Sequence, residues 1–153
     1  MNKQIERIRK TRLFLLDLVK DLSVEQMNEI PAGFNNNIIW NLAHLTAAQQ
    51  GICYIRAGVP IVVDEKYVAP FRPGTKPEEA IDAKEINTIK ELLMSTLEQL
   101  DMDYQNGVFN GYTTWMTRYN VELSNIDDAI EFLLFHEGFH SAYIMAMKRV
   151  ISK

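Results

Sequence analysis

Four long segments of the chain carry apolar residues at intervals of three and four, the spacing that gives an α-helix one buried side. The expected helices run from about Lys3 to Lys20, from Asn36 or Asn37 to Gly58, from around Pro77 to about Met102, and from Ser124 nearly to the C-terminus. Outside them, no stretch predicts a convincing sheet. Four helices without a sheet indicate an all-α fold, a four-helix bundle.

Residues that start and stop helices support these limits. Asn36 and Asn37 are both good N-cap residues for the second helix, and Gly58 is a strong stop at its end. Ser124 and Asp127 are spaced like a capping box at the start of the last helix. We therefore expect the second helix to be well defined.

The connections between the expected helices are irregular. After the first helix, Ser23 and Gln26 match the capping box of a short turn. A loop from Val59 to Lys76 contains three prolines, and loops of this length in a compact domain are often functional. The stretch from Tyr104 to Leu123 has two Asn-Gly turn signals, and we expect at most a short extended piece there.

Composition places the chain among ordinary globular domains. Of its 153 residues, 47% are hydrophobic and 24% are charged, which suits one domain over residues 1–153. The net charge of -4 is mild, and no arm collects enough lysine and arginine for a nucleic-acid surface. We expect the basic run of Arg7, Arg9, Lys10 and Arg12 to form the solvated side of the first helix.

Cysteine usage and hydropathy bear on the compartment. The single cysteine, Cys53, cannot form an internal disulfide, which fits a reducing environment. The longest apolar stretch, Ala129 to Met147, contains Glu131 and other polar residues, so we expect no membrane span. These features predict a cytoplasmic protein.

The chain has three histidines, and two of them fall in the segment HEGFH. His136 and His140 are one helical turn apart, about 40° around the helix, so they can share a metal ion. The same His-Glu-x-x-His pattern occurs in zinc proteases, which take a third ligand from further along the chain. Here the sequence after His140 contains neither histidine nor an acidic residue, so proteolysis is a distant alternative.

The third histidine, His44, lies in the middle of the second expected helix. If that helix neighbours the fourth, His44 can join His136 and His140 around a divalent metal ion. Three protein ligands leave a coordination position for water or substrate. The alternative is that all three are hydrogen-bonded core residues without a metal, although burying them together would leave several ring nitrogens without partners.

Two further residues are candidate catalytic groups. Glu137 lies about 60° from His140 around the helix, and it could act as a general base, orient a ligand imidazole, or be a partly exposed carboxylate at the bundle rim. Tyr143 could bind an anion or donate a proton, or be a core tyrosine. Helical angles place ten residues around the expected cavity: Asn37, Trp40, Asn41, Ala48, Gly51, Ala129, Phe132, Leu133, Tyr143 and Met147. Cys53 lies too far from His44 to be a ligand.

The histidine in NLAHLTAAQ, followed much later by HEGFHSAYI, resembles the DinB-like (YfiT-like) superfamily of metal-binding four-helix proteins. The likeness covers almost the whole chain, including the run YTTWMTRYNVELSNIDDAI before the last helix. It implies an up-down-down-up bundle, a site for zinc, nickel or a similar ion at His44, His136 and His140, and frequent homodimers. Characterised relatives of this kind include bacillithiol-using thiol S-transferases and mycothiol-dependent maleylpyruvate isomerases.

These observations favour a metal-dependent enzyme that acts on a small molecule. We expect thiol S-transferase-like chemistry, with a low-molecular-weight thiol as one substrate. Metal-dependent hydrolysis, with Glu137 as the base, is the second choice. From a different class, a non-catalytic helical module that binds a ligand or partner would hold no stoichiometric metal.

Overall fold

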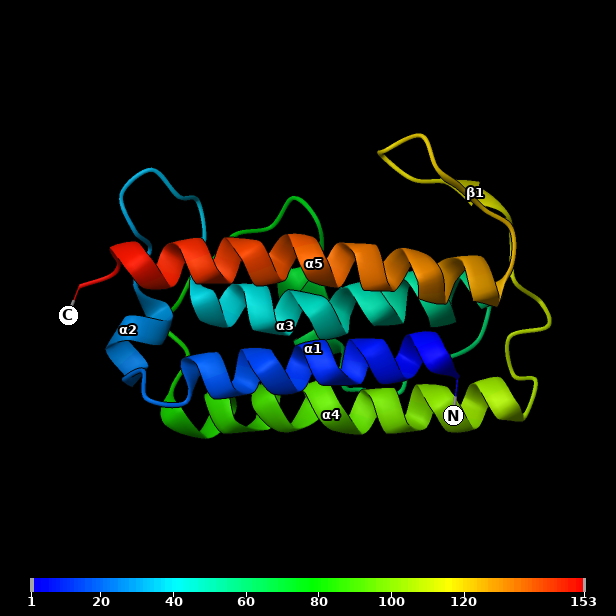
Figure 1. Ribbon diagram of the computed structural model, residues 1–153, viewed down its shortest axis with the longest axis horizontal. Coiled ribbons are helices and arrows are strands. Elements are labelled where there is room, and N and C mark those ends of the chain that lie inside the picture. The colour runs from blue at the N-terminus through cyan, green and yellow to red at the C-terminus, as the bar shows by residue number, and fades with distance from the viewer. Residues whose placement is uncertain (1, 153) are drawn as a thin grey trace.

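Four long helices lie side by side and form the body of the molecule (Figure 1). They are α1 (Lys3–Val19), α3 (Ile38–Gln49), α4 (Ala83–Gln105) and α5 (Ile126–Val150) in a computed structural model that describes residues 2–152. Helices α1 and α5 run in one direction and α3 and α4 in the other, so the order is up-down-down-up (Figure 1). The all-α bundle expected from the sequence is confirmed.

The helices pack as a square in which each has two neighbours. Helix α1 contacts α4 and α5, and α3 contacts the same two helices. Residues of the connection after α3 also cover it, so every residue from Ile38 to Gln49 is buried. Because α3 is enclosed in this way, only 4% of the surface of His44 is exposed.

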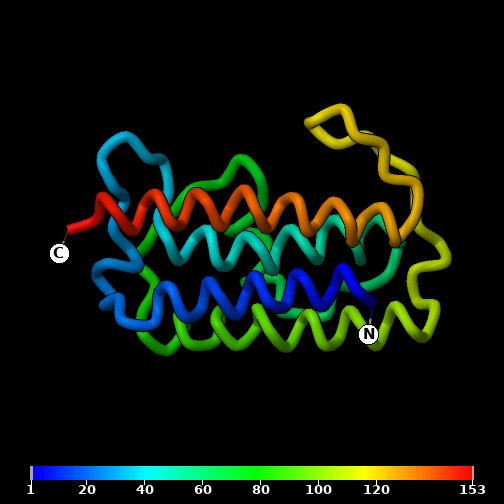
Figure 2. The backbone as a smooth tube through the Cα atoms, viewed as in Figure 1, coloured from blue at the N-terminus to red at the C-terminus, as the bar shows by residue number. Residues whose placement is uncertain are grey.

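Short elements link the long helices. The turn after α1 forms α2 (Val24–Asn28), and its predicted capping box is confirmed by reciprocal bonds between Ser23 and Gln26. Since α3 and α4 run in the same direction, the chain between them must return along the bundle (Figure 2). This return contains two 3₁₀ turns, η3 (Glu65–Tyr67) and η4 (Ala69–Phe71).

Helix α3 changes its winding before it ends. It continues as a π-helix, η1 (Gln50–Tyr54), and then as a 3₁₀ turn, η2 (Ile55–Ala57). Gly58 stops it with a φ of 70°, the left-handed conformation that glycine adopts without strain. π-Helical turns often occur at functional sites, and this one forms part of a cavity wall described below.

Two predicted helix starts are wrong. The third helix begins at Ala83 instead of around Pro77, because Asn28 of α2 bonds both the N–H and the carbonyl of Ile81 and keeps the preceding segment outside the helix. The last helix is capped one residue later than predicted, since the Asn125 side chain accepts from the N–H of Asp128. The bonds of Asn28 join residues that are far apart in the sequence, and the last helix has two neighbouring candidate caps. The spacing of apolar residues alone predicts neither helix start to the residue.

The connection from α4 to α5 contains the expected short extended piece. Strands β1 (Trp115–Met116) and β2 (Glu122–Leu123) pair in antiparallel fashion, with Trp115 opposite Leu123. In Figure 2 this hairpin passes around one end of the bundle and rises beside α5. It thereby brings residues 117–119 to the side of the bundle where α5 carries its histidines.

The buried interior consists of two apolar clusters, one towards each end of the bundle. Between them lies a hydrogen-bonded set of four buried polar side chains, one from each long helix, which we call the buried polar layer. Its members are Arg12, Gln49, Thr96 and Glu137. No helix in residues 2–152 is long and apolar enough to span a membrane.

Candidate metal centre

The structure brings the three histidines together. His44 comes from α3, and His136 and His140 come from successive turns of α5. One ring nitrogen from each lies within 4.8 Å of the others, and the Nε2 atoms of His44 and His136 are 3.2 Å apart. Four zinc bonds of 2.0–2.1 Å in tetrahedral geometry separate ligand nitrogens by about 3.3 Å, so this pair has the spacing of two ligands.

Hydrogen bonds at the far side of two rings fix which nitrogen faces the centre. The Nδ1 of His44 donates to the carbonyl oxygen of Phe71 at 2.6 Å, and the Nδ1 of His140 donates to Oδ1 of Asn41 at 2.8 Å. Asn41 uses its own amide N–H to bond the Asn37 carbonyl, so its oxygen is the acceptor. Both imidazoles therefore present an Nε2 lone pair to the centre, as metal ligands do.

Burial keeps these imidazoles uncharged. Desolvation lowers the pKa of His44, lowers that of His136 to about 2 with help from His140 and His44, and lowers that of His140 to about 3. Neutral imidazole is the form that binds a metal ion. The Nε2 of His136 faces the centre, while its Nδ1 is buried without a hydrogen-bond partner among the described residues.

The centre lies in the wall of a cavity of about 710 Å³, a size typical of small-molecule sites. All three histidines line this cavity. The indole of Trp40 stacks on the His44 ring, with centroids 4.8 Å apart and planes inclined by 10°. Of the described histidine, cysteine and acidic residues, only these three form a cluster that could hold a metal ion, so a coordination position would face the cavity.

The cavity includes six of the ten residues that helical angles placed around it. These are Trp40, Asn41, Ala48, Gly51, Phe132 and Tyr143. The other four are core residues: Asn37, Ala129, Leu133 and Met147. They differ because the hairpin and the residues on either side of η4, Val68 and Arg72, line one side of the cavity, while neighbouring helices cover these four.

Tyr143 lines the cavity, with 38% of its surface exposed, and is not a core residue. Its ring packs edge-on against Phe34 at 5.1 Å. This placement keeps Tyr143 available as a group that contacts substrate, whereas Cys53 lies buried in the apolar cluster at one end of the bundle. Burial raises the pKa of the Cys53 thiol, so it is an unreactive core residue.

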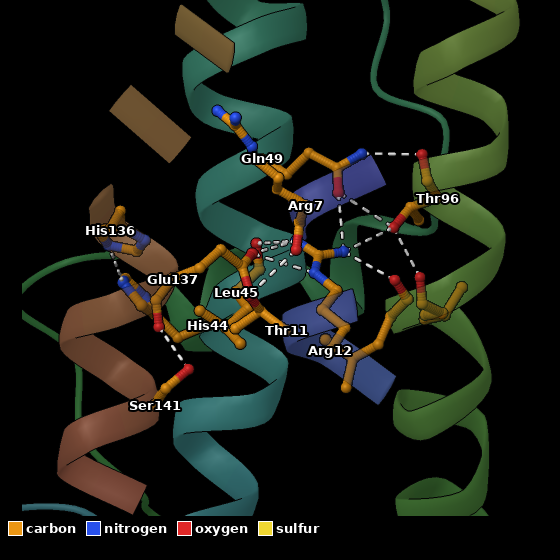
Figure 3. Close-up of polar contacts among 12 residues, drawn as sticks. Arg7, Thr11, Arg12, His44, Leu45, Gln49, Thr96, His136, Glu137 and Ser141 are labelled. Atoms are coloured by element: carbon orange, nitrogen blue, oxygen red, sulfur yellow. Dashed lines mark hydrogen bonds and ion pairs between the residues drawn. The ribbon is translucent and has the colours of Figure 1, made fainter. Parts of the chain in front are cut away.

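Glu137 does not line the cavity. Of the alternatives for this residue, a partly exposed carboxylate at the rim is wrong because Glu137 is fully buried. Its Oε1 accepts from Nη2 of Arg12 at 2.6 Å and from Nε at 3.0 Å (Figure 3). The carboxylate therefore points into the bundle interior, and not into the cavity that the histidines line. This geometry does not favour Glu137 as a general base for a reaction in the cavity.

Arg12, expected on the solvated side of α1, is instead completely buried. Besides Glu137, its guanidinium bonds Oε1 of Gln49 at 3.0 Å (Figure 3). It also donates to the carbonyl of Leu93 at 2.8 Å. A signal for this burial exists in the sequence, since Arg12 completes the spacing of the buried residues of α1. That series is Ile5, Ile8, Arg12, Leu15 and Val19.

Comparison with known proteins agrees with the fold and the histidines. Residues 7–144 match the model of the DinB superfamily, and this range contains all three histidines. No curated protein matches the chain. Because the match spans most of the 153 residues, the chain belongs to the DinB superfamily.

Proposed function

We propose that this DinB-superfamily protein is a metal-dependent enzyme with thiol S-transferase-like activity on a small molecule. His44, His136 and His140 would hold a divalent ion, with zinc or nickel as the first candidates because imidazole suits both. The observation that carries the proposal is the convergence of three uncharged imidazoles in the wall of an open cavity of about 710 Å³.

A divalent ion at this position would make a coordinated thiol or water acidic enough to lose its proton near neutral pH. The protein's own residues would prepare the centre for this role. Phe71 and Asn41 hold two of the rings in the required tautomer. Trp40 and the other apolar walls limit water around the reacting groups, which strengthens electrostatic interactions there.

Tyr143 is the remaining candidate for a residue that contacts the reacting molecule. Its side chain lines the same cavity as the histidines. We propose that its hydroxyl donates a hydrogen bond or proton to an anionic group of the substrate. Hydrolysis, the second candidate from the sequence, has less support because Glu137 is paired with Arg12.

Elemental analysis tests the metal site. The protein should be purified without metal-affinity steps and assayed for zinc, nickel, copper and iron, together with His44→Ala, His136→Ala and His140→Ala. We expect one divalent ion per chain in the parent and a large loss in each variant. Phe139→Ala is the control, since Phe139 precedes His140 and lines the cavity but offers no ligand atom. Equal metal content in all five proteins would refute the site.

The reaction is tested on the metal-loaded protein. Low-molecular-weight thiols should be incubated with electrophiles, and ester and amide substrates should be assayed in parallel. The proposal predicts metal-dependent thiol conjugation. Turnover of only the esters or amides would replace the proposed transferase with a hydrolase. A protein that purifies without stoichiometric metal, and that stays inactive in both assays after metal is added, would favour a binding module.

A further inference from the structure

The walls of the histidine cavity carry positive but no negative side chains. Arg56, Arg72 and Arg118 all line it, and its lining contains neither aspartate nor glutamate. This contrasts with the whole chain, which has 20 acidic against 16 basic residues and a net charge of -4. A cavity of one charge sign in a protein of the other sign attracts ligands of opposite charge to the cavity.

Arg56 is one of two cavity arginines with unused donors. It lies on η2, and its guanidinium carbon is 4.0 Å above the centre of the Trp115 ring, which holds it in place by a cation–π contact. Within residues 2–152 no carboxylate lies within 4.0 Å of Arg56. Arg72 differs, because it already pairs with Glu65 at 2.8 Å.

Arg118 is the second arginine with unused donors. It lies in the turn between β1 and β2, with its guanidinium carbon 5.6 Å from the Tyr119 ring centre. No described carboxylate pairs with it either. Arg56 and Arg118 thus reach one cavity from two separate elements, η2 and the hairpin, and both present a planar fork suited to carboxylate or phosphate.

Much of the remaining cavity wall is apolar. Phe132 and Phe139 of α5 and Trp115 of the hairpin supply aromatic walls. Arg56 follows His44 by twelve residues along nearly continuous helix, which separates their backbones by roughly 18 Å along the axis. A molecule that reaches from the histidines to Arg56 must therefore be extended, and its middle would lie against these aromatic walls.

We infer that the cavity binds an elongated organic anion, whose carboxylate or phosphate group pairs with Arg56 and Arg118 and whose apolar body lies against Phe132, Phe139 and Trp115. This assignment deepens the proposed function and rests on it for one point, that the opposite end of the molecule reacts at the histidines. The arginine contacts themselves do not require a metal ion.

Calorimetric titration with three probes of one shape tests the inference. The probes are 6-phenylhexanoate, 6-phenylhexyl phosphate and the neutral 6-phenylhexanamide, each titrated into metal-loaded and chelator-treated protein. A hydrogen-bonded ionic contact of about 1.5 kcal/mol corresponds to roughly tenfold in Kd. We expect at least one anion to bind about tenfold more tightly than the amide, with or without metal, and to weaken as salt increases.

Paired variants identify the residues responsible. Arg56→Gln with Arg118→Gln should remove the preference for the anion and leave binding of the amide unchanged. Arg7→Gln with Arg149→Gln is the matched control, because it removes two exposed arginines that lie outside the cavity. Circular dichroism checks that each pair leaves the fold intact. The anion with the lower Kd shows whether the cavity prefers a carboxylate or a phosphate group.

Three results would overturn the inference. The first is equal affinity for the amide and both anions. The second is an anion preference that survives loss of both cavity arginines, and the third is a preference that disappears with the metal, which would indicate that the anion coordinates the ion. Failure of the proposed function looks different: a protein without metal that still shows an arginine-dependent anion preference refutes only the metal-dependent activity.

Discussion

Replacing Arg12 with methionine tests whether Glu137 belongs to the bundle interior or to the reaction. The variant leaves a carboxylate fully buried with no cation beside it, because both side chains of this pair are at most 1% exposed. Breaking a buried ion pair on one side typically destabilises a protein by about 3–5 kcal/mol. Domains of this size are stable by about 5–15 kcal/mol, so Arg12→Met should remove a large share and lower the Tm by roughly 6–20 °C.

Removing both charges should be far less harmful. In Arg12→Met with Glu137→Leu no buried charge remains, and such replacements are often neutral or stabilising. The second oxygen of Glu137, Oε2, is buried without a described partner, so the native pair is incompletely satisfied. We therefore expect the double variant to be at least about 2 kcal/mol more stable than Arg12→Met, a strongly non-additive double-mutant cycle.

Urea unfolding of metal-free protein is the appropriate assay, since bound metal would add its own stabilisation. Arg9→Met is the control: Arg9 pairs with Glu6 on the exposed side of the same helix and should matter little. A small effect of Arg12→Met, comparable with that control, would refute the structural role of the pair. Loss of turnover in Glu137→Gln, with stability and metal content unchanged, would restore Glu137 as a reacting group.

The metal centre gives four more predictions. A chelator should lower the Tm of the purified protein by roughly 5–10 °C if the ion was present at about 100 times its Kd, and no shift would contradict a folded-state metal site. Metal-free protein should lose stability as pH falls from 6.5 towards 3, because burial lowers the pKa of His136 to about 2 and of His140 to about 3 while the unfolded chain takes up protons. The free energy of unfolding should fall by up to about 1.4 kcal/mol per pH unit for each histidine. A free energy of unfolding that stays constant over this range in urea titrations would refute the neutral buried state. Asn41→Ala removes the acceptor of the His140 Nδ1–H and should weaken metal affinity about 10–100-fold, against a smaller change in Asn36→Ala, as measured by competition with a chromogenic chelator. Tyr143→Phe should reduce turnover by about a hundredfold or more at unchanged metal content if its hydroxyl donates a proton, whereas equal rates would make it a wall residue.

The resemblance to DinB-like proteins also implied a homodimer. A second copy of the chain would give a mass of twice 17.7 kDa by light scattering. If the dimer is found, the first residues to replace are Phe135 and Phe139, two aromatic side chains of α5 that are about half exposed. A mass of one chain at micromolar concentration would contradict this expectation.

Much of the fold followed from local patterns. Apolar spacing located the four long helices, and polar caps such as Ser23 and Asn37 marked helix starts that the structure retains. The start of α4 was misplaced because it depends on Asn28, which bonds Ile81 across 53 residues of sequence. Arg12 was misassigned to the surface because charge is normally a better guide to exposure than position in a heptad-like series.

The sequence by itself determined that His136 and His140 share one face of a helix, since helical geometry fixes that relation within a single turn. It also determined that His44 lies within another long helix. Only the tertiary structure decided that α3 packs beside α5, so that all three rings meet, and that Glu137 turns inward to Arg12. It likewise brought Arg56 and Arg118 to the same cavity. The physical reason is that side-chain direction along one helix follows from local geometry, whereas the partner across the interface follows from how separate elements pack.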